Sequence, residues 1–351
     1  MRPALAASQL SNVCSAGLSE RENSTLRART KGARIERNAD GVEVLKTRYG
    51  DSMMGEAFDH VDFHLERMDR QGVSTSVLSL LGSFCWIEGQ PVEVSVPLCR
   101  LVNDALSRIC QQHEGRFLAH AALPLTDIPV AAEELDRALG LPGIVGAQLP
   151  ANGFLTAKAA EKMRPLLEVA NRRHGVFFIH HGPLPGDPFP KHSHSDTDNA
   201  RRRNGTLDMQ ACLSSAMVTL CLTDFLAPYP NAKIYLHNLG GNIPYEVERM
   251  DHRCLLDTPK EELPSARFRK SQVRVDCNSF GPRAIEAAVR LYGAERIVCG
   301  TDGTEFGVDW TLKALAEAEI GEVARQQILE DNAAAMLAHR ASSRQREKTA
   351  A

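Results

Sequence analysis

Short apolar runs alternate with longer stretches of helical character from residue 73 to the C-terminal region. The apolar runs are rich in β-branched residues and predict strands. They lie at Val73–Leu81, Phe117–Leu125, Ile144–Leu149, Val176–His181, Lys233–His237, Val273–Asn278 and Arg296–Gly300. Helices are expected at Val94–His113, Ile128–Leu139, Ala157–His174, Leu207–Ala227, Pro282–Tyr292 and Gly321–Ala338. Strands that alternate with helices are typical of parallel βα units whose sheet is covered on both faces.

The region before these units has a different pattern. Two short apolar stretches, Ala33–Glu36 and Val42–Tyr49, flank the turn-forming residues 38–41 and predict a β-hairpin. A helix is expected next at His60–Gln71, with Gly72 at its C-terminal cap.

The two ends of the chain are expected to lie outside the folded domain. Residues 1–32 are rich in Ala, Ser and Arg and show no clean apolar period, so we expect an irregular or disordered segment. Residues 341–351 are polar and charged and are expected to form a disordered tail. The domain itself is expected to span residues 33–340.

A doubly wound sheet and a barrel would both produce this alternation. No G-x-G-x-x-G motif opens a helix after a strand, which argues against a nucleotide-binding doubly wound fold. Polar side chains end several strands instead, at His180, His237, Asn278 and Asp302. Because the active site of a barrel is built at that rim, we predict an α/β fold, a distorted (β/α)8 TIM barrel. The pattern supplies seven strands, so the eighth, the first of the barrel, is missing or altered and should precede Val73.

Composition narrows the function classes. The 351 residues are 43% hydrophobic and carry a formal net charge of −3, which gives no basic field for nucleic acid or an anionic membrane. No apolar run approaches the roughly 18 residues of a membrane span. The nine cysteines are scattered without a C-x-x-C pair, which favours reduced thiols in the cytoplasm.

Three strand ends carry residues suited to metal chemistry. His180 follows Val176–Ile179, His237 follows Lys233–Leu236, and Asp302 follows the last predicted strand. One such histidine alone would more often be a core residue bonded to a backbone group. Two imidazoles and a carboxylate at three strand ends form a ligand set for Zn²⁺, Mn²⁺ or Fe²⁺.

Other ionisable residues carry weaker signals. His192 and His194 lie in a Pro- and Asp-rich loop and are expected at the surface. His60 and His64 are one helical turn apart, but their charged neighbours indicate a solvated helix face. Arg48 could bind a substrate carboxylate through two hydrogen bonds.

Several motifs together resemble one enzyme family. They are Leu65–Val73, Gly115–Phe117 with Ala122–Leu125, Ile179–His180, His237–Tyr245 with Glu248–Met250, and Gly300–Asp302. Across roughly Val61 to Leu337 the chain resembles the amidohydrolase-related family of the metal-dependent hydrolase superfamily. That family includes the aminocarboxymuconate-semialdehyde, γ-resorcylate and 5-carboxyvanillate decarboxylases.

The resemblance implies a distorted barrel with one divalent metal ion, zinc or manganese. It implies that His180 and Asp302 are metal ligands and that His237 is the catalytic acid or base. Arg48 matches the region of a substrate-carboxylate arginine. The chain departs from the family in two respects. No H-x-H or E-x-H of a first strand occurs before His60, and two residues separate His237 from Gly240 where many members have one.

The expected function is therefore a metal-dependent carboxy-lyase acting on a small unsaturated or aromatic carboxylic acid. Two alternatives remain open: a metal-dependent hydrolase of a C–C, C–N or lactone bond, and a degenerate, non-catalytic barrel. The expected partner is the small carboxylic acid, with no nucleic acid and no membrane, and a homo-oligomer is expected.

Overall fold

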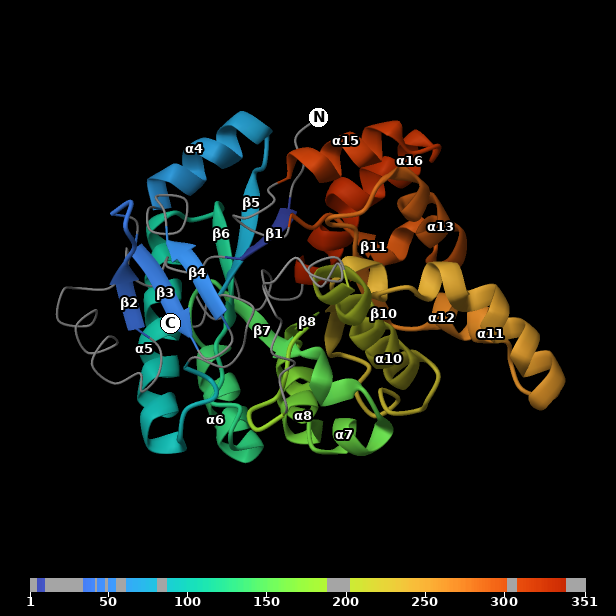
Figure 1. The fold of residues 1–351 in the computed structure, drawn as a ribbon, viewed down its shortest axis with the longest axis horizontal. Coiled ribbons are helices and arrows are strands. Elements are labelled where there is room, and N and C mark those ends of the chain that lie inside the picture. The colour runs from blue at the N-terminus through green and yellow to red at the C-terminus, as the bar shows by residue number, and fades with distance from the viewer. Residues whose placement is uncertain are drawn as a thin grey trace, which may run out of the picture.

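An eight-stranded parallel sheet forms the centre of the molecule (Figure 1). The computed structural model describes residues 5–9, 34–41, 43–47, 50–54, 61–80, 87–187, 203–301 and 308–338. In their order across the sheet, the strands are β1 (Leu5–Gln9), β5 (Thr75–Ser79), β6 (Phe117–Ala121), β7 (Ile144–Pro150), β8 (Val176–His180), β9 (Lys233–Leu236), β10 (Val273–Asp276) and β11 (Ile297–Val298). The sheet curls and helices surround it, which confirms the predicted barrel-like α/β architecture.

The strand missing from the sequence pattern is β1. Residues 5–9 belong to the segment expected to be irregular, but they pair in parallel with β5, with Leu5 opposite Thr75 and Gln9 opposite Ser79. The sequence Leu-Ala-Ala-Ser-Gln has few residues of high β propensity, so pairing with β5 rather than local preference forms the strand. Residues 10–33 lie outside the described part. Among the described residues, no pairing joins β1 to β11. The two edge strands of the curled sheet are therefore not hydrogen-bonded to each other in this part of the structure.

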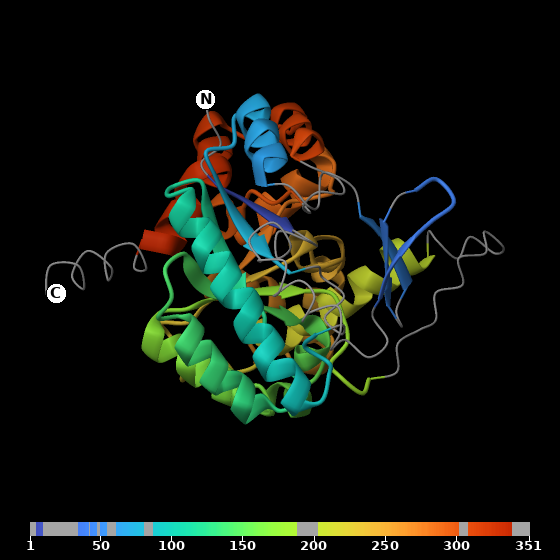
Figure 2. The ribbon, with the colours of Figure 1, turned by 90° about the vertical axis from the view of Figure 1, so that its left-hand side faces the viewer.

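A second, antiparallel sheet confirms the predicted hairpin and extends it. Strands β2 (Arg34–Arg37) and β3 (Glu43–Thr47) pair as expected, and β4 (Gly50–Met54), which was not predicted, adds a third strand. Figure 2 shows this small sheet on the side of the molecule opposite the C-terminal helical segment.

The helices lie around the curled sheet. They are α4 (Val61–Gln71), α5 (Val92–Gln112), α6 (Ile128–Ala138), α7 (Ala157–Glu161), α8 (Arg164–Arg173), α10 (Met209–Cys221), α11 (Ile243–Asp257), α12 (Pro264–Lys270), α13 (Pro282–Tyr292), α15 (Asp309–Glu317) and α16 (Glu322–Gln326). The single helix predicted at Ala157–His174 is two helices, because Pro165 lacks an N–H and stands in the first turn of α8. Contrary to the predicted solvated face, His64 on α4 is buried.

Apolar side chains pack on both faces of the sheet. Most of the core lies between the strands and the helices. A smaller interior cluster includes Val145, Val176 and Tyr235, which pack with Met336 and Leu337 from residues 332–338. Val176 is the first residue of β8 and Val145 the second of β7, whereas His180 lies at the other end of β8. No helix among the described residues has the length and apolarity to cross a membrane.

Candidate active site

Two histidines meet where adjacent parallel strands end. His180 is the last residue of β8, and His237 follows the last residue of β9. The backbone N–H of His237 donates to Ile179 O at 3.0 Å, which continues the strand pairing to the rim. The two imidazoles have ring centroids 4.3 Å apart and are 3% and 1% exposed. The structure thus brings together the two histidines that the sequence singled out.

The ring of His180 has a fixed orientation. Its Nδ1 lies 2.7 Å from the carbonyl oxygen of His181 and donates its proton there, since a carbonyl can only accept. The lone pair is therefore on Nε2. Burial, and the neighbouring imidazoles of His181 and His237, hold the pKa of His180 well below its usual range. His180 is accordingly a neutral imidazole, the form that binds a metal ion.

The chain turns sharply after His237. Asn238, Leu239, Gly240 and Gly241 all have positive φ, from 52° to 81°. The backbone at Gly241 approaches a neighbouring segment closely, because a Cβ there would lie 2.4 Å from Gln210 O. Asn238 and Leu239 are L-residues held in a left-handed conformation, a strain that is common where a functional side chain is fixed.

Asp276 at the end of β10 positions His237. Its Oδ2 lies 3.1 Å from His237 Nδ1, and its Oδ1 accepts from Asn238 N and Asn278 Nδ2, both at 2.9 Å. An unprotonated Nδ1 would direct its lone pair at the carboxylate, so charge places the proton on Nδ1 and the lone pair on Nε2. Asn278 Nδ2 lies 2.8 Å from His237 Nδ1, and both nitrogens donate to the Asp276 carboxylate. Sequence reasoning missed Asp276, although it precedes Asn278 by the two-residue period of a strand face.

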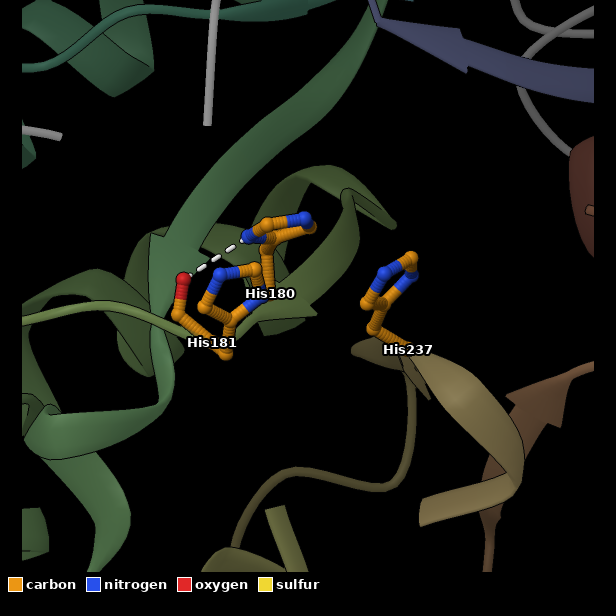
Figure 3. Close-up of side chains that lie close together, drawn as sticks. All are labelled: His180, His181 and His237. Atoms are coloured by element: carbon orange, nitrogen blue, oxygen red, sulfur yellow. Dashed lines mark hydrogen bonds between the residues drawn. The ribbon is translucent and has the colours of Figure 1, made fainter. Parts of the chain in front are cut away.

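A third histidine, His181, lies beside the two rim histidines. One ring nitrogen each from His180, His181 and His237 lie within 4.8 Å of one another. Figure 3 shows the three rings gathered at one place, His180 and His181 from β8 and the turn after it and His237 from the neighbouring strand. The ring centroids of His180 and His181 are 4.1 Å apart. Three nitrogen ligands at this separation form a candidate metal centre.

An aromatic layer lies beneath the histidines. Phe178 stacks on Tyr235 with ring centroids 4.7 Å apart and meets His237 edge-on at 5.6 Å. The Tyr235 hydroxyl lies 3.0 Å from His120 Nε2. Burial lowers the pKa of His120 to about 3, so this deeper histidine is neutral at physiological pH.

Asp302 and Arg48 lie outside the described residues, as do His60, His192 and His194.

The comparisons with known proteins agree with this architecture. The family model described as Amidohydrolase matches residues 87–338. The γ-resorcylate decarboxylase of Rhizobium sp. (strain MTP-10005) is 26% identical over 302 residues, covering 79% of this chain and 88% of that protein.

Solved structures show the same fold. A 2,6-dihydroxybenzoate decarboxylase crystallised with 2,6-dihydroxybenzoate superposes with a TM-score of 0.67 at 20% identity, over 96% of this chain and 99% of that one. A dihydroxybenzoic acid decarboxylase from Polaromonas sp. JS666, with bound manganese and the inhibitor 2-nitroresorcinol, gives 0.66 at 21% identity, over 96% and 97%.

Proposed function

Because the chain belongs to the amidohydrolase family, we propose that it is a metal-dependent decarboxylase of a small aromatic carboxylic acid, with a hydroxybenzoic acid as its substrate. The decarboxylases of γ-resorcylate and 2,6-dihydroxybenzoate to which it is similar support this choice of substrate. The observation that carries the proposal is the pair of buried imidazoles, His180 and His237, at the rim where parallel strands end.

The residues present fit a divalent metal ion. The buried, neutral His180 directs a lone pair into the site, and one ring nitrogen each of His180, His181 and His237 lie within 4.8 Å of one another. We assign His180 and Asp302 as metal ligands, with Asp302 assigned from the sequence. When bound, zinc or manganese supplies a Lewis acid that stabilises negative charge developing on a substrate oxygen.

His237 is assigned as the catalytic acid. Decarboxylation replaces a C–C bond by a C–H bond, so a proton must reach the ring carbon before or as CO₂ leaves. His237 Nε2 can carry this proton, because Nδ1 is held by Asp276. The Asp276 carboxylate stabilises the imidazolium form that precedes the transfer and keeps the ring in one orientation. Proton donation from Nε2 returns His237 to the neutral state.

Arg48 is assigned to the carboxylate of the substrate before it reacts. A guanidinium binds a carboxylate through two parallel hydrogen bonds and orients it. This assignment comes from the sequence, as for Asp302.

The experiment is a product assay on the purified chain. We expect CO₂ release and loss of the carboxylate signal by NMR when it is loaded with Zn²⁺ or Mn²⁺ and given 2,6-dihydroxybenzoate or related hydroxybenzoic acids. His237→Asn should lower kcat at least about 100-fold. The exposed His252 on α11 provides a matched control, and His252→Asn should leave kcat unchanged.

Two outcomes would replace the proposal. Hydrolysis of lactones, without CO₂ release from any hydroxybenzoic acid, would identify a hydrolase on the same rim. Full metal occupancy without turnover of either class would identify a non-catalytic barrel.

The cellular location and the oligomeric state of the protein are two further proposals. We propose a cytoplasmic location, supported by seven free cysteines among the described residues. We also propose a homo-oligomer, supported by the exposed Tyr245, Leu255 and Leu256 on α11. Light scattering of the protein as it elutes from a size-exclusion column would measure its mass and so test the homo-oligomer.

A further inference from the structure

His181 has an unusual position for the residue after a strand-end histidine. Successive side chains of a strand point to opposite faces, so a second histidine would ordinarily point away from His180. Strand β8 ends at His180, however, and the chain turns at once. Gly182 has φ 150°, and its carbonyl oxygen accepts from Asn152 N at 3.2 Å. The turn brings the second imidazole back toward the first.

The hydrogen bond between the two residues fixes this arrangement. His180 Nδ1 donates to the backbone oxygen of His181 at 2.7 Å, so the residue that supplies the second ring also orients the first. A backbone acceptor on Nδ1 is a common outer partner of a metal-binding histidine. The two rings are then held with centroids 4.1 Å apart (Figure 3).

Carboxylates are scarce around these rings in the described part of the chain. Strand β1 is Leu-Ala-Ala-Ser-Gln and contains no His, Cys, Asp or Glu. Asp276 lies beside His237, but its Oδ1 accepts two hydrogen bonds and its Oδ2 faces Nδ1. Among the described residues, the grouped atoms that could bind a metal ion are ring nitrogens of His180, His181 and His237, and of these three His237 is assigned to proton transfer.

We propose that His181 is a metal ligand beside His180 and Asp302, and that this added imidazole makes the chain select Zn²⁺ over Mn²⁺. The inference rests on the proposed function in that it requires a divalent ion at this rim. Imidazole favours zinc, whereas carboxylate and water suit manganese, so a second imidazole ligand moves the preference toward zinc. The Polaromonas decarboxylase, by contrast, was crystallised with manganese.

Metal binding is measured directly, without turnover. The full chain is stripped with a chelator, dialysed against Zn²⁺ and a hundredfold excess of Mn²⁺, and its metal content is determined by elemental analysis. We expect about one zinc per chain and little manganese. His181→Ala should weaken zinc binding at least about 100-fold, and the preference for zinc over manganese should shrink. His252→Ala on the exposed face of α11 is the matched control.

A second variant guards against misfolding. His181→Asn keeps a polar side chain of similar size, and circular dichroism of both variants checks that the fold persists. Cobalt substituted for zinc gives a visible spectrum that reports its ligands, and this spectrum should change in His181→Asn.

The possible results separate the two proposals. If His181→Ala binds zinc as tightly as the control while His180→Ala does not, His181 is not a ligand and the decarboxylase proposal stands. A wild-type preference for manganese would overturn the selectivity. If the wild-type chain binds neither ion, both proposals fail.

Discussion

His237 Nδ1 and Asp276 Oδ2 lie 3.1 Å apart, and both side chains are 1% exposed. A buried carboxylate is costly to desolvate unless hydrogen bonds satisfy it. Here Asn238 N and Asn278 Nδ2 donate to its other oxygen. The hydrogen-bonded carboxylate faces Nδ1 of the imidazole, which fixes the tautomer of that ring.

Replacing this carboxylate should impair catalysis more than folding. Asp276→Asn keeps the size of the side chain but removes the charge that stabilises protonated His237. We expect kcat to fall by about 10²- to 10⁴-fold with a smaller effect on KM, measured as CO₂ release. Asp331→Asn, at an exposed position, is the control. A kcat for Asp276→Asn within twofold of the control would remove Asp276 from the mechanism.

Glu88 should make stability depend on pH. Burial raises the pKa of this carboxyl from 4.5 to about 7, so the folded state binds its proton more tightly than the unfolded state. The free energy of unfolding must then fall as pH rises from about 4.5 to about 7 and stay lower above it. Between pH 5 and pH 8 this loss is about 2 kcal/mol.

The variant that tests this is Glu88→Gln. It should be more stable than wild type at pH 8 by about 2 kcal/mol and differ little at pH 5, as measured by urea unfolding at both values. Glu133→Gln, at an exposed position of α6, should show no such difference. Equal stabilities of Glu88→Gln and wild type at both pH values would contradict the raised pKa.

Gly146 permits the close approach of β7 and β8. A Cβ at this position would lie 1.6 Å from Val176 O and 2.7 Å from Val176 N, and backbone atoms cannot yield as a flexible side chain can. We expect Gly146→Ala to lower the free energy of unfolding by at least about 2 kcal/mol. Gly205→Ala, where an added Cβ meets nothing within 4 Å, should change it by less than about 1 kcal/mol. Similar unfolding midpoints for the two variants would contradict the clash.

Glu134 joins α5 to α6. It is 1% exposed and accepts from Arg100 Nε at 3.1 Å, Arg137 Nε at 2.8 Å and Asn103 Nδ2 at 2.8 Å. Because the arginines are partly exposed, Glu134→Ala should cost about 2 kcal/mol, less than a fully buried pair. Glu317→Ala removes an exposed ion pair with Lys313 and should cost less than about 1 kcal/mol. Equal losses on thermal unfolding would show that burial of Glu134 is unimportant.

The barrel could be predicted because most of its strands are apolar on both faces. Strands such as Val176–His180 are buried at every position, so they stand out from the helices as continuous apolar runs. Strand β1 does not stand out, because its small and polar residues become a strand through pairing with β5. Helix α11 was also missed, since only Ile243 and Val247 of it are buried and the apolar period is weak.

The site could be predicted where a single residue at the end of a strand carries the chemistry. His180 and His237 each follow an apolar run, and parallel strands bring such ends together. The roles of His181 and Asp276 depend on a turn at Gly182 and on contacts between neighbouring strands. The sequence pattern did not reveal the His237–Asp276 contact, because it joins residues far apart in the chain.

The segment 332–338 has a consequence for how the protein is made. Its side chains Ala333, Met336 and Leu337 cover the interior of the sheet at Val145 and Val176, yet the ribosome adds them after all eight strands. A nascent chain therefore exposes these interior residues of the sheet to water until this segment leaves the exit tunnel. Biogenesis of the barrel should finish after translation of the last strand, with the unsealed intermediate exposed to chaperones and to aggregation.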